Sequence, residues 1–308
     1  MKTILTLVSN PAEPAVTPQL AVKVRDALTM EGGRAAAADW LAPQIACDIA
    51  VEGLTLIEAE ARARAAVGDA PVDLFAQEAE GRRKKLLIAD MDSTMITVEC
   101  LDELADFAGK KAEIAAITER AMRGELEFEG ALRERVAMLK GLDESALAAT
   151  LTERIAIMPG ALELVRTMNK AGALTVLVSG GFTYFTSRVA EAIGFAEQRG
   201  NELIIEGGKL TGEVGMPILG RDAKLASLTA ARKRKGLSEG ETLAVGDGAN
   251  DLAMLQAAGL GVAYHAKPIV AEAAHARVDH GDLTALLYFQ GYRKADFVKA
   301  YSEKRTAS

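Results

Sequence analysis

Cysteine, histidine and tryptophan are scarce in this chain. Its 308 residues include 2 Cys, 3 His and 1 Trp. Two cysteines, Cys47 and Cys100, are too few for a disulfide framework and are typical of a reducing compartment. The histidines, His265, His275 and His280, come late in the chain and lack the spacing of zinc ligands. We therefore expect a cytoplasmic protein with neither structural disulfides nor a zinc site.

Long apolar runs and an excess of positive charge are missing as well. The first apolar run, Ile4–Val8, stops before Pro11 and is too short for the core of a signal peptide. The uncharged stretches 171–187 and 252–266 fall short of the roughly 20 apolar residues of a membrane span. The net charge of −7 repels nucleic acids and anionic membranes. We expect a small molecule as partner, no nucleic acid and no membrane, and leave a homodimer open.

The charged segment Glu78–Lys85 divides the chain into two differently patterned regions. Residues 1–80 alternate between apolar runs and amphipathic stretches, which predicts a small α/β domain. The strands expected there cover residues 3–8, 45–51 and 72–76, and the helices cover 19–29 and 55–66. Residues 34–37 are a further, alanine-rich candidate strand.

Short apolar runs alternate with helical segments in the second region. The expected strands cover residues 86–89, 174–178, 243–245 and 261–264, and the expected helices cover 161–171, 183–193, 222–235 and 250–258. Strands that are apolar on both faces predict a doubly wound, Rossmann-like parallel sheet. A helical stretch, 101–149, interrupts this pattern after the first strand, and Gly207-Gly208 predicts a hairpin.

Carboxylates follow the expected strands of this sheet. Asp90 and Asp92 come after the first strand, Ser179 after the second, and Asp247 and Asp251 after the third. Because parallel strands end at one edge of a sheet, these side chains should meet there. Four carboxylates at one edge favour a Mg²⁺ ion, which prefers oxygen ligands, and the helix N-termini beside them suit a phosphate.

Two carboxylates separated by one residue can take different chemical roles, one as nucleophile and the other as acid and base. Asp90 could attack phosphorus and form an acyl phosphate. Asp92 could protonate the leaving oxygen and then activate water. Lys224 could neutralise the attacking carboxylate and the phosphoryl charge. The sequence therefore predicts catalysis by Asp90, Asp92 and Lys224.

The four motifs together resemble the haloacid dehalogenase superfamily over about residues 86–290. They are Asp90-x-Asp92-Ser-Thr94, Ser179-Gly180-Gly181, Lys224 and Gly246-Asp247-Gly-x-Asn250-Asp251. The resemblance implies that Ser179, with Gly180 and Lys224, contacts the substrate phosphate. It also implies that Asp247 and the backbone carbonyl of Asp92 bind Mg²⁺ beside Asp90. Asn250 and Asp251 would support metal and phosphate.

The helical insertion resembles the cap of the phosphoserine phosphatase family. The resemblance rests on Glu99, Met122 and the segment Phe128–Arg135. It implies that Glu99 binds the substrate ammonium, that Arg135 binds its carboxylate, and that Met122 and Phe128 shield the pocket. O-phosphoserine carries an ammonium, a carboxylate and a phosphate, so an anion, a guanidinium fork and a metal would match it.

The expected organisation follows from this resemblance. The N-terminal domain covers residues 1–80, the catalytic core 81–97 and 158–295, the helical cap 98–157, and a tail 296–308. The N-terminal domain resembles ferredoxin-like regulatory modules of the amino-acid-binding type. Whether it binds serine, mediates dimerisation or only packs on the core stays open.

The expected activity is Mg²⁺-dependent hydrolysis of O-phospho-L-serine to L-serine and phosphate through a phosphorylated Asp90. This reaction would be the last step of phosphorylated serine biosynthesis. The alternative is a phosphotransferase or phosphatase that acts on another small phosphorylated amino acid or alcohol, such as homoserine, because both share the first half-reaction. A third hypothesis is a regulatory protein whose catalytic half is no longer active. The intact motifs argue against this hypothesis.

Overall fold

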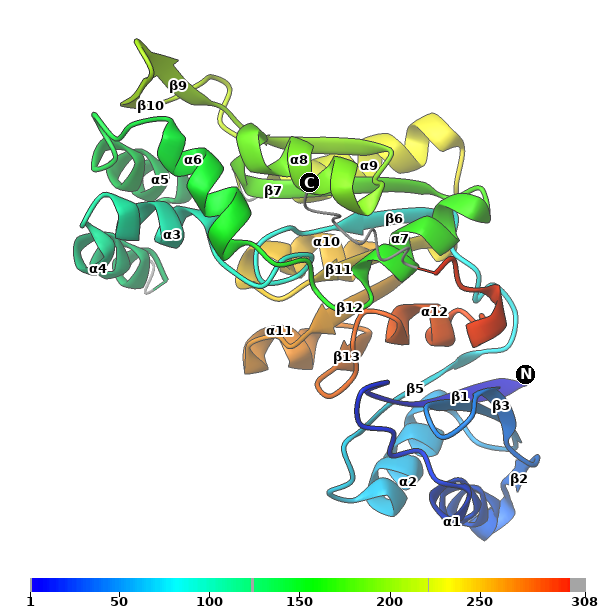
Figure 1. Ribbon diagram of the computed structural model, residues 1–308. Coiled ribbons are helices and arrows are strands. Elements are labelled where there is room, and N and C mark those ends of the chain that lie inside the picture. Colours follow the sequence, from blue (N-terminus) through cyan, green and yellow to red (C-terminus); the bar gives the residue numbers. More distant parts are fainter. Residues whose placement is uncertain (1, 123–124, 221, 300–308) are drawn as a thin grey trace, which may run out of the picture.

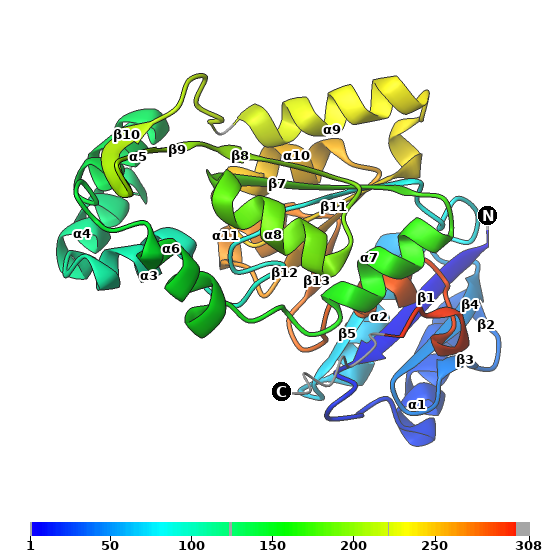
Figure 2. The same ribbon diagram turned by 45° about the horizontal axis from the view of Figure 1, so that its top comes forward.

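The computed structural model describes residues 2–122, 125–220 and 222–299 of the chain. Figures 1 and 2 show a central sheet covered by helices, with the N-terminal sheet on one side of it and a group of cap helices at another end. The parallel and antiparallel sheets confirm the predicted fold class. The predicted limits of the domains stay a prediction. No helix in these described ranges is long and apolar enough to cross a membrane.

The N-terminal sheet has the strand order β2-β4-β1-β5, with β3 also paired to β4. Its pairs are antiparallel, so its element order and pairing are those of a ferredoxin-like unit. Thr17 caps the first helix, and Thr55 and Glu58 form a capping box at the second. The elements are β1 Thr3–Ser9, α1 Pro18–Thr29, β2 Arg34–Ala35, β3 Asp39–Ala42, β4 Ala46–Glu52, α2 Leu56–Val67 and β5 Val72–Glu78.

The two faces of this sheet pack against different partners. Leu5 and Ile49 on one face join the buried cluster that includes residues of α1 and α2. Val8 and Phe75 on the other face belong to the large cluster that includes residues of the core sheet, where the ring centroids of Phe75 and Phe289 lie 5.5 Å apart. The N-terminal sheet is therefore covered on both faces, by its own helices and by the core.

The core contains a six-stranded parallel sheet in the order β13-β12-β11-β6-β7-β8. Its central strand, β6, lies between β11 and β7. After β6 the chain forms β7 and β8 on one side of this strand and later β11, β12 and β13 on its other side. This reversal places a topological switch point beside β6. The strands are β6 Leu86–Ala89, β7 Leu174–Phe182, β8 Glu197–Asn201, β11 Thr242–Gly246, β12 Leu260–Tyr264 and β13 Ala276–Val278.

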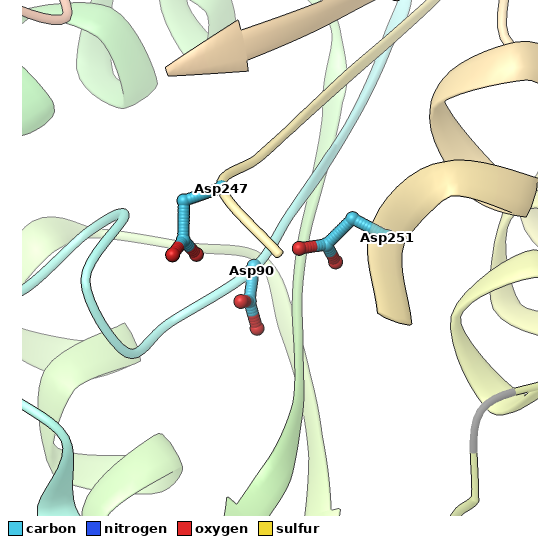
Figure 3. A group of neighbouring side chains, drawn as sticks. All are labelled: Asp90, Asp247 and Asp251. Carbon is cyan, nitrogen blue, oxygen red and sulfur yellow. The ribbon is translucent and has the colours of Figure 1, made fainter. Parts of the chain in front are cut away.

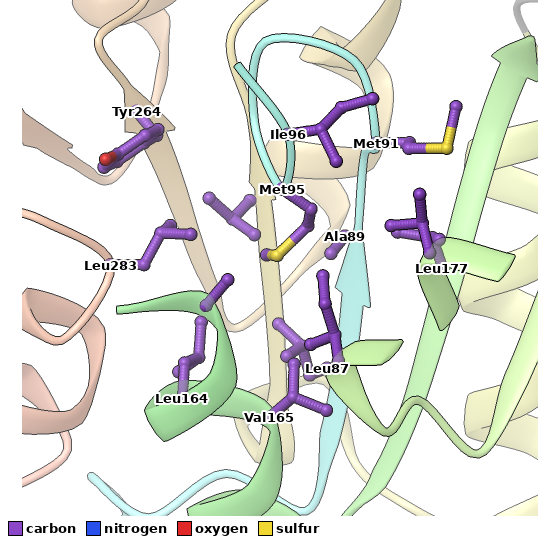
Figure 4. Packing of buried hydrophobic residues seen from close by; sticks show 14 of the residues in the cluster. Leu87, Ala89, Met91, Met95, Ile96, Leu164, Val165, Leu177, Tyr264 and Leu283 are labelled. Atoms are coloured by element: carbon purple, nitrogen blue, oxygen red, sulfur yellow. The ribbon is translucent and has the colours of Figure 1, made fainter. Parts of the chain in front are cut away.

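Helices cover both faces of the core sheet because successive strand residues point to opposite sides. Leu87 of β6 lies in the same cluster as Leu164 and Val165 of α7 (Figure 4), whereas Ile88 belongs to the cluster of the other face. The helices of the first face are α7 Ala161–Lys170, α8 Thr183–Ile193 and α12 Ala285–Phe289. Those of the second are α9 Asp222–Lys235, α10 Leu252–Ala257 and α11 Pro268–Ala273.

The cap follows β6 and confirms the predicted helical insertion. Its helices are α3 Cys100–Phe107, α4 Lys111–Met122, α5 Phe128–Ala137 and α6 Ser145–Ala149, followed by a π-helical turn at Thr150–Arg154. The predicted hairpin is present as β9 Leu203–Glu206 and β10 Lys209–Val214. The backbone N–H of Gly141 donates to the carbonyl of Leu210, which joins the hairpin to the cap.

Several elements differ from the predicted ones. Five elements were not predicted, because they are short or polar and show little periodicity: β3, β8, β13, α11 and α12. Strand β7 continues to Phe182, beyond the predicted end at Val178, with a shift of register between these two residues. Ser179 and the two glycines after it therefore lie within an irregular strand end rather than in the following loop.

Candidate active site

Three carboxylates meet at the carboxyl edge of the core sheet. Asp90 follows β6, Asp247 follows β11, and Asp251 precedes α10. One oxygen from each lies within 4.8 Å of the others, and Figure 3 shows the three groups facing a common point. Asp90 and Asp251 are buried. The structure thus brings together three of the four carboxylates that the strand ends predicted to meet, whereas Asp92 is not part of this cluster.

Lys224 of α9 reaches two of these carboxylates. Its Nζ lies 2.7 Å from Oδ1 of Asp90 and 2.6 Å from Oδ1 of Asp251. Burial disfavours the ammonium, but the two carboxylates outweigh it and raise the pKa of Lys224. Burial and then repulsion from Asp251 raise the pKa of Asp90, against the attraction of Lys224. Lys224 therefore stays protonated beside the proposed nucleophile.

Asp247 is oriented by a threonine of the first motif. The hydroxyl of Thr94 donates to Oδ1 of Asp247 over 3.2 Å. Burial, Asp251 and Glu99 raise the pKa of Asp247 to about 6. The backbone N–H of Gly248 donates to Oδ2 of Asp251 over 3.1 Å, so the loop after β11 also orients this carboxylate. Nearby negative charge thus makes the ionised form of Asp247 costly.

The donor set fits a divalent cation with oxygen ligands. Within this cluster, the ammonium of Lys224 faces three carboxylates, which leaves two negative charges uncompensated. Burial first, and then this repulsion, raise the pKa values of Asp90 and Asp247. A Mg²⁺ ion held by Asp90, Asp247 and Asp251 would remove it, and its remaining positions would suit water and a phosphate oxygen.

Asp92 lies at the junction of core and cap. Its Oδ2 accepts a hydrogen bond from the Ser179 hydroxyl over 3.3 Å, and its Oδ1 accepts one from the backbone N–H of Cys100 over 3.2 Å. Burial and then the charge of Glu99 raise its pKa to about 7. A carboxyl with this pKa can donate a proton and take one back near neutral pH.

Glycines let the motif segments approach one another. A Cβ on Gly246 would lie 2.4 Å from Cγ of Asp251, so only glycine leaves room for this carboxylate. A Cβ on Gly181 would lie 3.1 Å from Oδ2 of Asp92. The Gly181 N–H donates to Oγ of Ser179 over 2.8 Å, and the Ser179 hydroxyl in turn donates to Asp92.

The cap supplies Glu99, Phe128 and Arg135, as predicted. Glu99 immediately precedes α3, and its charge acts on both Asp92 and Asp247. Burial lowers the pKa of the Arg135 guanidinium, whereas Asp102 and Glu99 oppose this shift. The charge of Glu99 therefore acts on Asp92 and Asp247 of the core as well as on Arg135 of the cap.

Phe128 covers the second motif. A Cβ added to Gly180 would lie 3.1 Å from Cζ of Phe128, so the ring lies directly against the backbone of the strand end. The side chain of Met122 lies outside the described residues. Asn250, in the turn before α10, has its Oδ1 2.3 Å from where a Cβ on Gly248 would lie, so its amide folds back over that loop.

The sequence reasoning assigned no role to several residues that orient the site. Thr94 stood in the first motif and could have been found there. Ser93 has φ of 54° and donates to Oε1 of Glu99 over 2.7 Å. Asn201, buried at the end of β8, donates to the carbonyl of Gly180 over 2.8 Å. Arg135 donates to the Thr118 hydroxyl over 3.4 Å. No motif signals the last two contacts, because they join distant parts of the chain.

Comparisons with known proteins show which proteins this chain is similar to. The profile of haloacid dehalogenase-like hydrolases matches residues 87–256. A phosphoserine phosphatase from Polaromonas sp. is 46% identical over 208 residues, which cover 66% of this chain and 88% of the relative. The Streptomyces coelicolor phosphoserine phosphatase is 37% identical over 300 residues, covering 96% of this chain and 72% of the relative. The unliganded structure of a probable phosphoserine phosphatase from Vibrio cholerae has a TM-score of 0.76 and 32% identity, covering 96% of this chain and 88% of that one.

Proposed function

Because the chain belongs to the haloacid dehalogenase-like hydrolase family, we propose that it is a Mg²⁺-dependent phosphatase that hydrolyses O-phospho-L-serine to L-serine and phosphate. The observation that carries this proposal is the position of Glu99 immediately before the cap helix α3, within electrostatic reach of both Asp247 and Arg135. An anion, a guanidinium and a phosphate site complement the ammonium, the carboxylate and the phosphate of the substrate.

Asp90 is the proposed nucleophile. One of its carboxylate oxygens attacks phosphorus, and the bond between phosphorus and the serine oxygen breaks. Lys224, at 2.7 Å from Oδ1 of Asp90, offsets the charge of the attacking carboxylate and of the phosphoryl group. The proposed Mg²⁺, held by Asp90, Asp247, Asp251 and the backbone carbonyl of Asp92, supplies charge neutralisation for the phosphoryl oxygens when it is bound.

Asp92 is the proposed acid and base. Its proton goes to the departing serine oxygen in the first step. In the second step the Asp92 carboxylate takes a proton from water, whose oxygen attacks phosphorus and releases Asp90 and phosphate. The Ser179 hydroxyl and the Cys100 N–H keep Asp92 oriented through both steps. Ser179, Gly180 and Asn250 are the proposed phosphate contacts at the same edge.

The cap selects the substrate in this proposal. Arg135 binds the substrate carboxylate and Glu99 its ammonium. Phe128, which already lies against Gly180, keeps water from the phosphate site together with Met122. The exclusion of water also strengthens the interaction of Lys224 with the phosphoryl group.

Replacement of Arg135 tests the assignment. Arg135→Ala should raise the KM for phosphoserine by about 100-fold, as expected for the loss of a charged contact of roughly 3 kcal/mol, and spare the hydrolysis of an aryl phosphate without a carboxylate. Arg133→Ala, on the exposed side of the same helix, is the matched control. Equal losses on both substrates would contradict the role given to Arg135.

The phosphotransferase alternative shares the phosphorylated Asp90. Adding serine, homoserine or another small alcohol to the reaction, and looking for a new phosphoester, separates the two activities. We expect water to be the acceptor. The place of this reaction at the end of phosphorylated serine biosynthesis, the cytoplasmic location and the homodimer all stay predictions.

A further inference from the structure

A buried carboxylate of the N-terminal domain holds a loop of the catalytic core. Asp73 lies in β5 and is 4% exposed. Its side chain accepts hydrogen bonds from the backbone N–H groups of Asp279 at 2.8 Å, His280 at 3.2 Å and Gly281 at 2.7 Å. These residues directly follow β13, so the carboxylate bridges the edge strands of the two sheets.

The next contact leads from this loop into the core. The carbonyl of Gly281 lies 3.0 Å from Nε2 of His265. The backbone N–H of His265 donates to the carbonyl of Val278 over 2.9 Å. His265 also has a φ of 43°, a backbone conformation that few residues other than glycine adopt. Both contacts hold His265 against the segment that Asp73 organises.

The last contact ends at the proposed metal site. His265 and Lys267 belong to the loop between β12 and α11. The backbone N–H of Lys267 donates to the carbonyl of Asp247 over 3.3 Å. Asp247 supplies one of the three clustered carboxylates. A continuous series of hydrogen bonds and short backbone segments thus joins Asp73 to Asp247.

We propose that Asp73 is a positioning residue for the metal site, acting through the loop 279–281 and His265 on the conformation of Asp247. The N-terminal domain then completes the metal-binding loop in addition to packing on the core. This inference rests on the proposed function only in taking Asp247 as a metal ligand. A loop held in one conformation loses less entropy when it binds a cation, so the series of contacts should strengthen metal binding.

Other contacts between the domains provide the control. Arg293 binds both carboxylate oxygens of Asp39, at 2.9 and 2.7 Å. This pair joins the N-terminal domain to the residues after α12 and is exposed. Asp39→Asn therefore weakens docking without touching the loop 279–281. If Asp73→Asn weakens Mg²⁺ binding more than Asp39→Asn does, the difference measures the positioning of the metal-binding loop rather than the docking of the N-terminal domain.

Calorimetric titration of the full-length protein with Mg²⁺, without substrate, tests the proposal. Asp73→Asn replaces one accepting oxygen by an NH₂ group that cannot accept the N–H bonds. We expect it to weaken Mg²⁺ binding about 3- to 30-fold, the usual range for residues coupled to a site at a distance, and Asp39→Asn to leave it unchanged. Equal affinity in wild type and Asp73→Asn, or equal weakening in both variants, would overturn the proposal.

His265→Ala interrupts the middle of the series and guards against a folding defect in Asp73→Asn. It should weaken Mg²⁺ binding by a similar factor, and the double variant should bind no more weakly than the weaker single variant. Fully additive effects would show that the two residues act independently and would contradict the proposal. If the metal affinities are as expected but the wild-type protein does not hydrolyse phosphoserine, the proposed function alone is contradicted.

Discussion

Arg82 connects the N-terminal domain to the core through a buried ion pair. Its Nη1 lies 2.7 Å from Oδ2 of Asp48, and the two side chains are 11% and 10% exposed. The guanidinium also donates to the hydroxyl of Thr6 and to the carbonyls of Tyr288 and Phe289, over 3.1, 3.2 and 3.1 Å. One side chain therefore satisfies acceptors on β1, β4 and α12.

Arg82→Met keeps much of the aliphatic volume and removes these hydrogen bonds. It leaves the carboxylate of Asp48 buried, with only the Thr6 hydroxyl still donating to it at 2.6 Å. Removing one partner of a buried pair costs about 3–5 kcal/mol, because the remaining charge has no counter-ion. We expect a loss of unfolding free energy in this range.

Urea denaturation followed by circular dichroism measures the loss, with Arg34→Met as control. Arg34 pairs with Glu52, but its side chain is 79% exposed, so its removal should cost less than about 1 kcal/mol. Adding Asp48→Asn to Arg82→Met should recover part of the loss, because no buried charge then remains. A cost for Arg82→Met no greater than that for Arg34→Met would refute this reasoning.

Two further predictions concern the active site. Lys224→Met leaves the carboxylates of Asp90 and Asp251 without their ammonium, so kcat should fall about 100- to 1,000-fold, as when one oxyanion donor is lost. Steady-state phosphate release measures kcat, and a decrease of less than about tenfold would contradict the role of Lys224. Gly180→Ala places a Cβ 3.1 Å from Cζ of Phe128 and should raise the KM for phosphoserine. Phe128→Leu should partly restore the KM in the double variant, and no such rescue would show that the ring is not the obstacle.

The core sheet and its carboxylates were predictable from local patterns. Strands β6 and β11 are largely apolar, and an aspartate directly follows each of them. The parallel arrangement then brings Asp90 and Asp247 to one edge, whatever the exact length of each strand. The pairing of Asp90 with Lys224 was also expected from the motifs, and the structure gives it a distance of 2.7 Å.

The contacts between distant segments were not predictable in this way. Asp73 is a single acid in a strand, and nothing in its neighbourhood signals that the backbone at 279–281 donates to it. Arg82 lies in the charged segment that predicted a domain boundary, yet its side chain is largely buried. Strand β13 has three residues and carries no periodicity of its own. Such features arise only when the two domains pack together.

Phosphate release from O-phospho-L-serine, with Mg²⁺ and with EDTA, tests the proposed activity most directly. Sugar phosphates and an aryl phosphate serve as comparison substrates in the same assay. We predict a strong preference for phosphoserine that EDTA abolishes and added Mg²⁺ restores, because the pocket and the metal cluster act together. Equal rates on all substrates, or release from phosphoserine that EDTA leaves unchanged, would contradict the account.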